Sequence, residues 1–177
     1  MYEWLLSIGA GQIMVDVVGG ALMGKIRAGP QGPLVDHNIN TGLITQIYNI
    51  MSRPYPRAGT CVYRATLLNL DLLDIEIPIS ASTTLSIDFA VRWLTVQGFI
   101  NLPSSCCILK IEMDSQVPYL AIQRPSEPGS QDEILIPAGQ LIVDRKYRRQ
   151  DGITIIEGKL SPWSQKQCLQ YISDHKF

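Results

Sequence analysis

The sequence lacks the side-chain clusters that common catalytic and metal sites require. It has two histidines: His37 follows a loop rich in proline and glycine, and His175 lies near the end of the sequence. Neither stands where a histidine of a rigid catalytic triad is usual. The four cysteines show no Cys-x-x-Cys spacing, and the two histidines do not complete a zinc site with them. We therefore predict no enzymatic activity, no catalytic residue, no metal site and no cofactor.

Charge of either sign is also scarce. The chain has 15 lysines and arginines and 16 acidic side chains, which gives a net charge of -1. A chain so close to neutral is not expected to bind polyanions over its whole surface, so any such contact needs a local cluster of cations. Hydrophobic residues make up 46% of 177 residues, which is enough for a buried core and argues against disorder.

No apolar run is long enough to span a membrane, which takes about 20 uninterrupted apolar residues. Glu3, Gln12 and Asp16 interrupt the apolar N-terminal region, and no cation precedes it as in a signal peptide. We predict that residues 1–33 are an apolar segment with a hinge loop, detachable from a globular domain over residues 34–177. Whether the segment packs on its own domain or on a neighbouring copy stays open. Its candidate side chains for self-association or membrane contact are Tyr2, Trp4, Leu5, Leu6, Met14 and Val18.

The spacing of apolar residues predicts an α+β fold, a single domain with a mainly antiparallel sheet and flanking helices. Helical spacing occurs over 13–26, 43–51 and 86–97, and a short final helix is expected within 161–177. Residues that alternate between apolar and polar predict strands. The predicted strands are Leu67–Ile77 with a bulge near Leu72, Cys107–Met113, and a hairpin from Ile134 to Ile156 that turns at Asp151-Gly152; polar connections are expected at 80–84 and 125–133.

One cluster of cations stands out near the tip of the predicted hairpin. Arg145, Lys146, Arg148 and Arg149 surround Tyr147. A solvated hairpin end explains the cluster, and so does a contact to phosphate in a nucleocapsid or in lipid head groups. Because the chain as a whole is slightly acidic, we favour the phosphate contact.

Two other groups of conspicuous side chains have structural explanations. Asp71, Asp74 and Glu76 alternate with aliphatic residues, which is typical of the solvated face of a strand rather than of paired acid and base catalysts. Phe89 and Trp93 are four residues apart on one face of the helix predicted over 86–97, and this spacing favours a position in the core.

A longer pattern resembles a known family. Tyr63 leads into the strand Leu67–Ile77, a helix follows with Trp93 near its end, and Gly98 comes soon after. This order is similar to the central part of rhabdovirus matrix proteins, and the size suits the plant-infecting branch. The short aromatic and basic C-terminal region, residues 172–177, is also similar to that of members of the family.

The resemblance implies a viral matrix protein in the virion and the host cytoplasm, peripheral to a membrane. Such a protein self-associates, condenses the nucleocapsid and bridges it to the inner face of the membrane. The implied partners are other copies of this chain, a viral nucleoprotein or ribonucleoprotein, and an anionic membrane surface, with RNA reached only indirectly.

The sequence leaves three alternatives to a matrix protein open. One is a plant-virus capsid-like or movement protein, and another is a host binding module without enzymatic activity. The last is a hydrolase or transferase whose site is dispersed along the sequence. A concave pocket that holds titratable side chains would favour this last alternative.

Overall fold

A computed structural model describes residues 48, 59–68, 70–71, 74–77, 81–96, 106–113, 117–122 and 133–175. The predicted N-terminal segment, residues 1–33, lies outside the described residues, as does most of the helix predicted over 43–51, of which only Tyr48 is described and is helical. No helix among the described residues is long and apolar enough to cross a membrane.

The described chain forms one sheet with two helices, which confirms the predicted α+β class and a mainly antiparallel sheet. The elements are β1 (Thr60–Leu67), β2 (Asp74–Ile77), β3 (Ala81–Thr84), α4 (Ile87–Val96), β4 (Cys106–Met113), β5 (Leu120–Ile122), β6 (Glu133–Ile136), β7 (Gly139–Arg148), β8 (Thr154–Pro162) and α5 (Gln165–His175). In the sheet these strands follow the order β2-β7-β8-β4-β1-β3-β6-β5, and only β4 and β8 pair in parallel.

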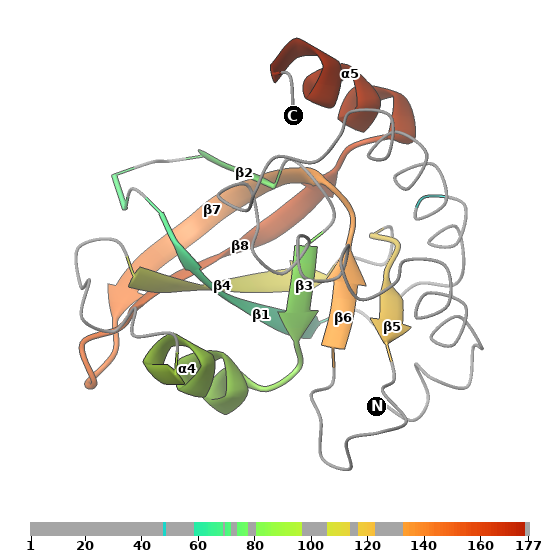
Figure 1. The fold of residues 1–177 in the computed structure, drawn as a ribbon. Coiled ribbons are helices and arrows are strands. Elements are labelled where there is room, and N and C mark those ends of the chain that lie inside the picture. The colour runs from blue at the N-terminus through green and yellow to red at the C-terminus, as the bar shows by residue number, and fades with distance from the viewer. Residues whose placement is uncertain are drawn as a thin grey trace.

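The sheet consists of two groups of strands that meet at a narrow seam. β1 pairs with β4 through a continuous ladder from Thr60↔Met113 to Leu67↔Cys106, but it pairs with β3 only at Tyr63↔Thr84. Figure 1 shows β3, β6 and β5 running across the direction of β4, β7 and β8. The sheet is therefore strongly curled, and the strands of its two groups diverge on either side of the seam.

Each face of β1 contributes to a different apolar cluster. Val62 belongs to a large core shared by both groups of strands, which includes Ile111 and Ile134. Tyr63 and Ala65 point to the other face and pack with the helix α4. The alternation of side chains along one strand therefore connects the core of the sheet to the underside of α4.

The start of α4 is fixed by hydrogen bonds from the end of β3. Thr84 Oγ1 accepts a hydrogen bond from the backbone N–H of Ser86 at 3.1 Å, and Ser86 Oγ accepts one from the N–H of Phe89 at 3.2 Å. Ser86 is thus the N-cap of the helix, and Asp88 lies in its first turn, where a negative charge is favourable. The helix predicted over 86–97 is confirmed.

The hairpin β7–β8 turns at Asp151-Gly152, as predicted, and Gly152 has φ of 85°, a conformation that favours glycine. The predicted C-terminal helix is α5, which begins with a capping box. Ser164 Oγ accepts the N–H of Gln167 at 3.3 Å, and Gln167 Oε1 accepts the N–H of Ser164 at 2.9 Å.

Two predictions about strands are wrong. Residues 67–77 are not one bulged strand, because β1 ends at Leu67, Leu70 and Asp71 lie in a turn, and β2 pairs with β7 at the far edge of the sheet. The shift in the alternation of apolar and polar residues, which suggested a bulge, comes from a change in the direction of the chain. The Ser/Thr segment predicted as a polar connection contains β3, since threonine is β-branched and suits a strand.

Candidate functional site

The seam between β1 and β3 holds an arginine at its centre. Arg64 follows the single paired residue Tyr63, and its Nη1 donates a 2.7 Å hydrogen bond to the backbone oxygen of Ser82 on β3. Here β1 and β3 diverge. The Arg64 side chain therefore donates to the Ser82 carbonyl, which a backbone N–H would satisfy if the two strands paired further. The guanidinium of Arg64 therefore bridges the two groups of strands.

A buried carboxylate lies on the next pair of strands. Glu133 begins β6, pairs with Thr84 on β3, and is only 3% exposed. Ser82 is two residues from Thr84 on the same face of β3, which makes it the diagonal neighbour of Glu133. Ser82 Oγ donates a 2.5 Å hydrogen bond to Glu133 Oε1. A carboxylate is costly to bury, so its position beside a serine and close to an arginine indicates a functional site.

The threonines that follow Ser82 on β3 hold β3 and β6 in register. Thr83 is 3% exposed, and its Oγ1 donates a 2.7 Å hydrogen bond to the backbone oxygen of Ile134. Its neighbour Thr84 is also buried and, as the cap of the β3–α4 connection, ties the strand to the helix. Ser82 is therefore placed by backbone pairing with β6 on one side of its strand and by the Arg64 side chain on the other.

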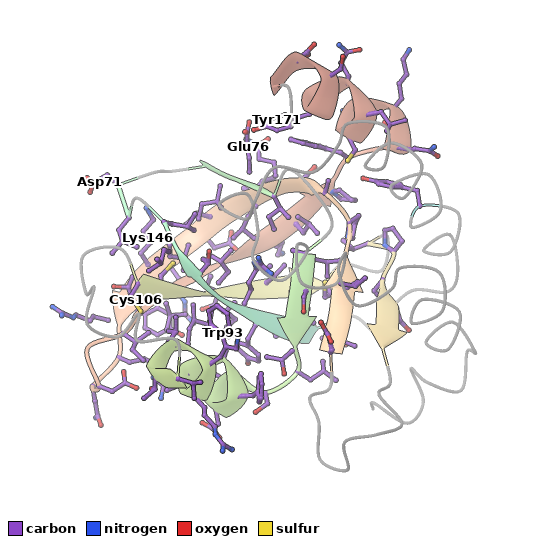
Figure 2. The ribbon with its side chains drawn as sticks, viewed as in Figure 1. Asp71, Glu76, Trp93, Cys106, Lys146 and Tyr171 are labelled. Carbon is purple, nitrogen blue, oxygen red and sulfur yellow. The ribbon has the colours of Figure 1, made fainter. Side chains whose placement is uncertain are left out.

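Aromatic side chains line the same space as Ser82, Thr83 and Thr84 of β3. Phe89 and Trp93 lie one turn apart on α4, and Tyr63 stands beside them on β1. Figure 2 shows Trp93 on the side of α4 that faces the strands. Together they line a shallow hollow of about 60 Å³ that is open to solvent. It is lined by Tyr63, Arg64, Ala65, Ser82, Thr83, Thr84, Phe89, Ala90 and Trp93.

Trp93 and Phe89 are therefore not simply core residues, as their spacing had suggested. Both are half-buried, and while Trp93 packs against the cluster under α4 it also forms part of the hollow. The prediction placed the correct face of the helix inward but missed the space that remains between this face and the strands.

The electrostatics of the hollow combine the Arg64 cation, which lines it, with the carboxylate of Glu133, which is buried behind Ser82. Burial lowers the pKa of Arg64 to about 10, which still leaves its guanidinium charged at neutral pH. Ser82 links this cation to the Glu133 carboxylate through its backbone oxygen on one side and its hydroxyl on the other. A ligand in the hollow thus meets the Arg64 cation and flat apolar rings, and the Glu133 carboxylate is buried behind Ser82.

The structure does not gather the predicted basic cluster into one site. Arg145 and Tyr147 point to one face of β7, where Arg145 Nε donates to Glu157 Oε2 at 2.7 Å and the guanidinium lies 5.1 Å from the Tyr147 ring centroid. Lys146 points to the other face, and its Nζ donates to the backbone oxygen of Leu70 at 2.7 Å. Strand alternation has separated neighbours in sequence.

The remaining two cations of the cluster bind within the hairpin turn. Arg148 Nε donates a 2.9 Å hydrogen bond to the backbone oxygen of Gly152, and Arg149 Nη2 lies 3.2 Å from Asp151 Oδ2. Contact of these cations with phosphate stays a prediction. The candidates for self-association, from Tyr2 to Val18, lie outside the described residues.

Glu76, one of the predicted solvated carboxylates, connects two elements of the fold. Glu76 is exposed and accepts a 3.0 Å hydrogen bond from the hydroxyl of Tyr171, which ties α5 to the edge strand β2 (Figure 2). Asp71 is exposed in its turn. No group of three or more potential metal ligands occurs in the described ranges.

Sequence reasoning missed Arg64, Ser82 and Glu133 because they come from three segments spread over about 70 residues. Glu133 stands directly before the aliphatic run Ile134–Ile136, and a lone carboxylate at the start of a buried strand was a usable signal. The β-branched threonines that follow Ser82 were a weaker signal for a strand, and the segment was interpreted as a polar connection.

No protein-family model matches the sequence, and no curated protein matches it at a significant level. Solved structures do share the fold. C3larvin toxin, an ADP-ribosyltransferase from Paenibacillus larvae, superposes with a TM-score of 0.56 at 14% identity over 91% of this chain and 100% of its own. The C3 exoenzyme of Clostridium limosum gives a TM-score of 0.51 at 17% identity over 90% of this chain and 84% of its own.

A third similar structure is the ADP-ribosylating toxin BECa of C. perfringens, solved with NADH. It has a TM-score of 0.56 at 15% identity over 90% of this chain, which spans 45% of the BECa chain. The chain therefore shares its fold with these three structures. At these identities the likeness concerns the fold, and the activity has to be argued from the residues in the hollow.

These comparisons overturn the predicted family. The likeness to rhabdovirus matrix proteins is wrong, because the structures that share the fold are ADP-ribosylating enzymes. The function and partners drawn from it are wrong as well, namely virion assembly with other copies of this chain, a nucleoprotein and an anionic membrane. The prediction of a non-enzymatic protein is contradicted by the same neighbours.

Proposed function

We propose that this chain is an ADP-ribosyltransferase, which cleaves NAD and transfers its ADP-ribose to an acceptor. The observation that supports this most is the buried Glu133 carboxylate, which is held by Ser82, while Ser82 and Arg64 line an aromatic hollow. The same fold in enzymes that ADP-ribosylate adds independent support.

The chemistry asks for a carboxylate at the sugar. Breaking the bond between the ribose C1′ and the nicotinamide nitrogen sends the bonding electron pair to the ring, which leaves as neutral nicotinamide. Positive charge then develops on C1′ and the ring oxygen of the ribose, as in other glycosidic transition states. Glu133 supplies a fixed negative charge for this oxocarbenium-like state and an acceptor for a ribose hydroxyl.

Ser82 acts on the substrate through Glu133. Its hydroxyl donates to Oε1, which restricts the rotation of the carboxylate. Because Ser82 itself is fixed in β3 by its neighbours Thr83 and Thr84, the carboxylate is oriented before NAD arrives. Such preorganisation is a large part of electrostatic catalysis.

Arg64 and the aromatic wall suit the two other parts of the donor. A guanidinium is a planar fork of N–H donors that matches phosphate oxygens, so Arg64 is assigned to the diphosphate. Phe89 and Trp93 present flat apolar rings, against which the nicotinamide ring stacks. With these contacts C1′ would lie over the Ser82 and Glu133 side of the hollow.

The second half of the reaction forms a bond from C1′ to an acceptor atom that carries a lone pair. The acceptor loses one proton to solvent, and the products are nicotinamide and the ADP-ribosylated acceptor. Where no acceptor is present, water takes its place and the product is free ADP-ribose. Release of nicotinamide therefore reports on the hollow whichever acceptor is used.

The decisive experiment measures nicotinamide release from NAD by the full chain and by Glu133→Gln. The substitution keeps the shape and removes the charge, so we expect a loss of about 10³-fold, comparable to removal of one strong electrostatic contribution to a transition state. Ser82→Ala, which leaves the carboxylate in place, should lose less. The matched control is Glu157→Gln, a carboxylate outside the hollow, which should retain the wild-type rate.

Equal rates for wild type and Glu133→Gln would contradict the proposal, as would a wild-type chain that binds NAD without ever releasing nicotinamide. Circular dichroism and urea unfolding of each variant separate a loss of catalysis from a loss of fold.

A further inference from the structure

A row of side chains leads away from the hollow across four neighbouring strands. The register pairs Tyr63 on β1 with Lys110 on β4, Lys110 with Glu157 on β8, and Glu157 with Arg145 on β7. We call Tyr63, Lys110, Glu157 and Arg145 the charged row. Its first member, Tyr63, also lines the hollow, so the row is continuous with the proposed donor site.

The row is held together by one carboxylate. Glu157 accepts hydrogen bonds from Lys110 Nζ and Arg145 Nε, both at 2.7 Å. These contacts lower the pKa of Glu157 and raise that of Lys110, so all three groups stay charged at neutral pH. The negative charge of the row is thereby shared between two cations, which leaves a positive excess.

Arg145 ends the row as a preformed cationic fork. Its Nε is bound to Glu157 and its guanidinium lies over the Tyr147 ring, while its side chain is 65% exposed. In the part of the chain that the structure describes, Nη1 and Nη2 of Arg145 have no protein partner. A guanidinium ordered on one edge and one face presents its other edge to an incoming carboxylate.

We propose that the charged row is the docking surface for a protein acceptor, which places an acidic side chain on Arg145 while its modified side chain enters the hollow past Tyr63. This rests on the proposed function and names the kind of acceptor that the site takes. Three strand spacings of about 4.8 Å separate Tyr63 from Arg145, roughly 14 Å in all.

That distance decides the size of the acceptor. A small acceptor that occupied the hollow could not reach Arg145 at the same time, whereas a protein interface commonly covers about 800 Å² on each partner. The surroundings also suit a protein, because Ile142 is 52% exposed and Tyr147 is 39% exposed near Arg145. Tyrosine and arginine are among the residues that contribute most to protein interfaces.

The test separates docking from donor chemistry. Biotin-labelled NAD and soluble extracts of bacterial, plant, insect and mammalian cells serve as probes, and biotin transfer to protein is measured over a range of extract concentrations. For Arg145→Ala we expect the apparent KM for extract protein to rise about tenfold. Nicotinamide release without extract should stay within twofold of wild type, since water needs no docking.

Two further variants sharpen the result. Arg145→Lys keeps the charge but loses the fork, so its KM should lie between those of wild type and Arg145→Ala. Arg149→Ala removes a cation outside the row and should match wild type in both assays. A raised salt concentration should increase the wild-type KM and have little effect on Arg145→Ala.

Unchanged protein labelling by Arg145→Ala would overturn the docking proposal while leaving the proposed function in place. So would a wild-type chain that releases nicotinamide from NAD but labels no protein in any of the four extracts. A wild-type chain that neither releases nicotinamide nor labels protein refutes the proposed function itself, and the docking proposal with it.

Discussion

Two arginines of this chain each donate a hydrogen bond to a backbone carbonyl, but in different surroundings. Arg64 reaches Ser82 across the seam at 2.7 Å from a half-buried position, whereas the exposed Arg148 reaches Gly152 within its own turn at 2.9 Å. The first joins residues 18 apart in sequence and the second residues 4 apart. The sequence predicted a binding site at the contiguous cluster around Arg148. The isolated Arg64, however, is the arginine that Ser82 links to a buried carboxylate. Charge in a protein is informative where it is buried, not where it is dense in the sequence.

The first prediction sets Arg64→Ala against Arg148→Ala. Loss of Arg64 leaves the Ser82 carbonyl without this donor in a partly buried place, so the free energy of unfolding should fall by about 2 kcal/mol. Nicotinamide release should become undetectable if Arg64 also binds the diphosphate. Loss of Arg148 should cost less than about 0.5 kcal/mol, as for most exposed substitutions, and leave release unchanged. Urea unfolding and the NAD assay measure both quantities.

Arg64→Lys serves as the control for charge, because it keeps a cation without the planar fork and should recover stability better than activity. Equal unfolding free energies for Arg64→Ala and Arg148→Ala would show that the seam does not depend on its arginine.

The second prediction compares two residues of α4. Trp93 lines the hollow, while Val96 is 72% exposed at the end of the same helix. Stacking of a base on an aromatic ring contributes about 1–3 kcal/mol. Trp93→Leu should therefore raise the KM for NAD about tenfold with a smaller change in kcat. Val96→Ala should change neither KM nor kcat. Both variants are measured by steady-state kinetics over a range of NAD concentrations. A KM that is unaffected by loss of the indole would contradict the prediction.

The third and smallest effect concerns pH and the charged row. Hydrogen bonds from Arg145 and Lys110 lower the pKa of Glu157 in the folded chain below its ordinary value of 4.5. A lowered carboxyl pKa stabilises the fold above the ordinary pKa, and this stabilisation is lost as the pH falls through the folded value. At about pH 7, Glu157→Gln should be less stable than wild type by under about 1 kcal/mol.

The measurement is the urea midpoint of wild type and Glu157→Gln at neutral and at acidic pH. The gap between the two should close below the folded pKa of Glu157. A gap of the same size at both pH values would mean that the ion pairs are not its source.

The sequence was most informative where an element depends on its own residues. Helical spacing located α4, and Asp151-Gly152 located the turn of β7–β8, because capping and turn geometry are local. It failed for β3, where four residues are too few to show alternation, and for the region from Leu67 to Ile77, where a turn and a bulge produce the same shift of phase.

The candidate site depended on long-range pairing and was therefore out of reach. Ser82 meets Glu133 only because β3 pairs with β6, and this register is set by burial on both faces rather than by either sequence segment. The alternative of a transferase with a dispersed site described such an arrangement without being able to locate it. These scattered residues become a candidate site only once the fold brings them together at the hollow, which has Arg64 at its edge.

The position of β8 has a consequence for the synthesis of the protein. β8 is the last strand along the chain, yet it lies inside the sheet between β7 and β4. A nascent chain that stops before residue 154 leaves β4 with one open edge and β7 with no strand to connect it to β4. β2 and β7 cannot join the rest of the sheet until β8 has left the ribosome, so on a growing chain the edge of β4 stays open until then.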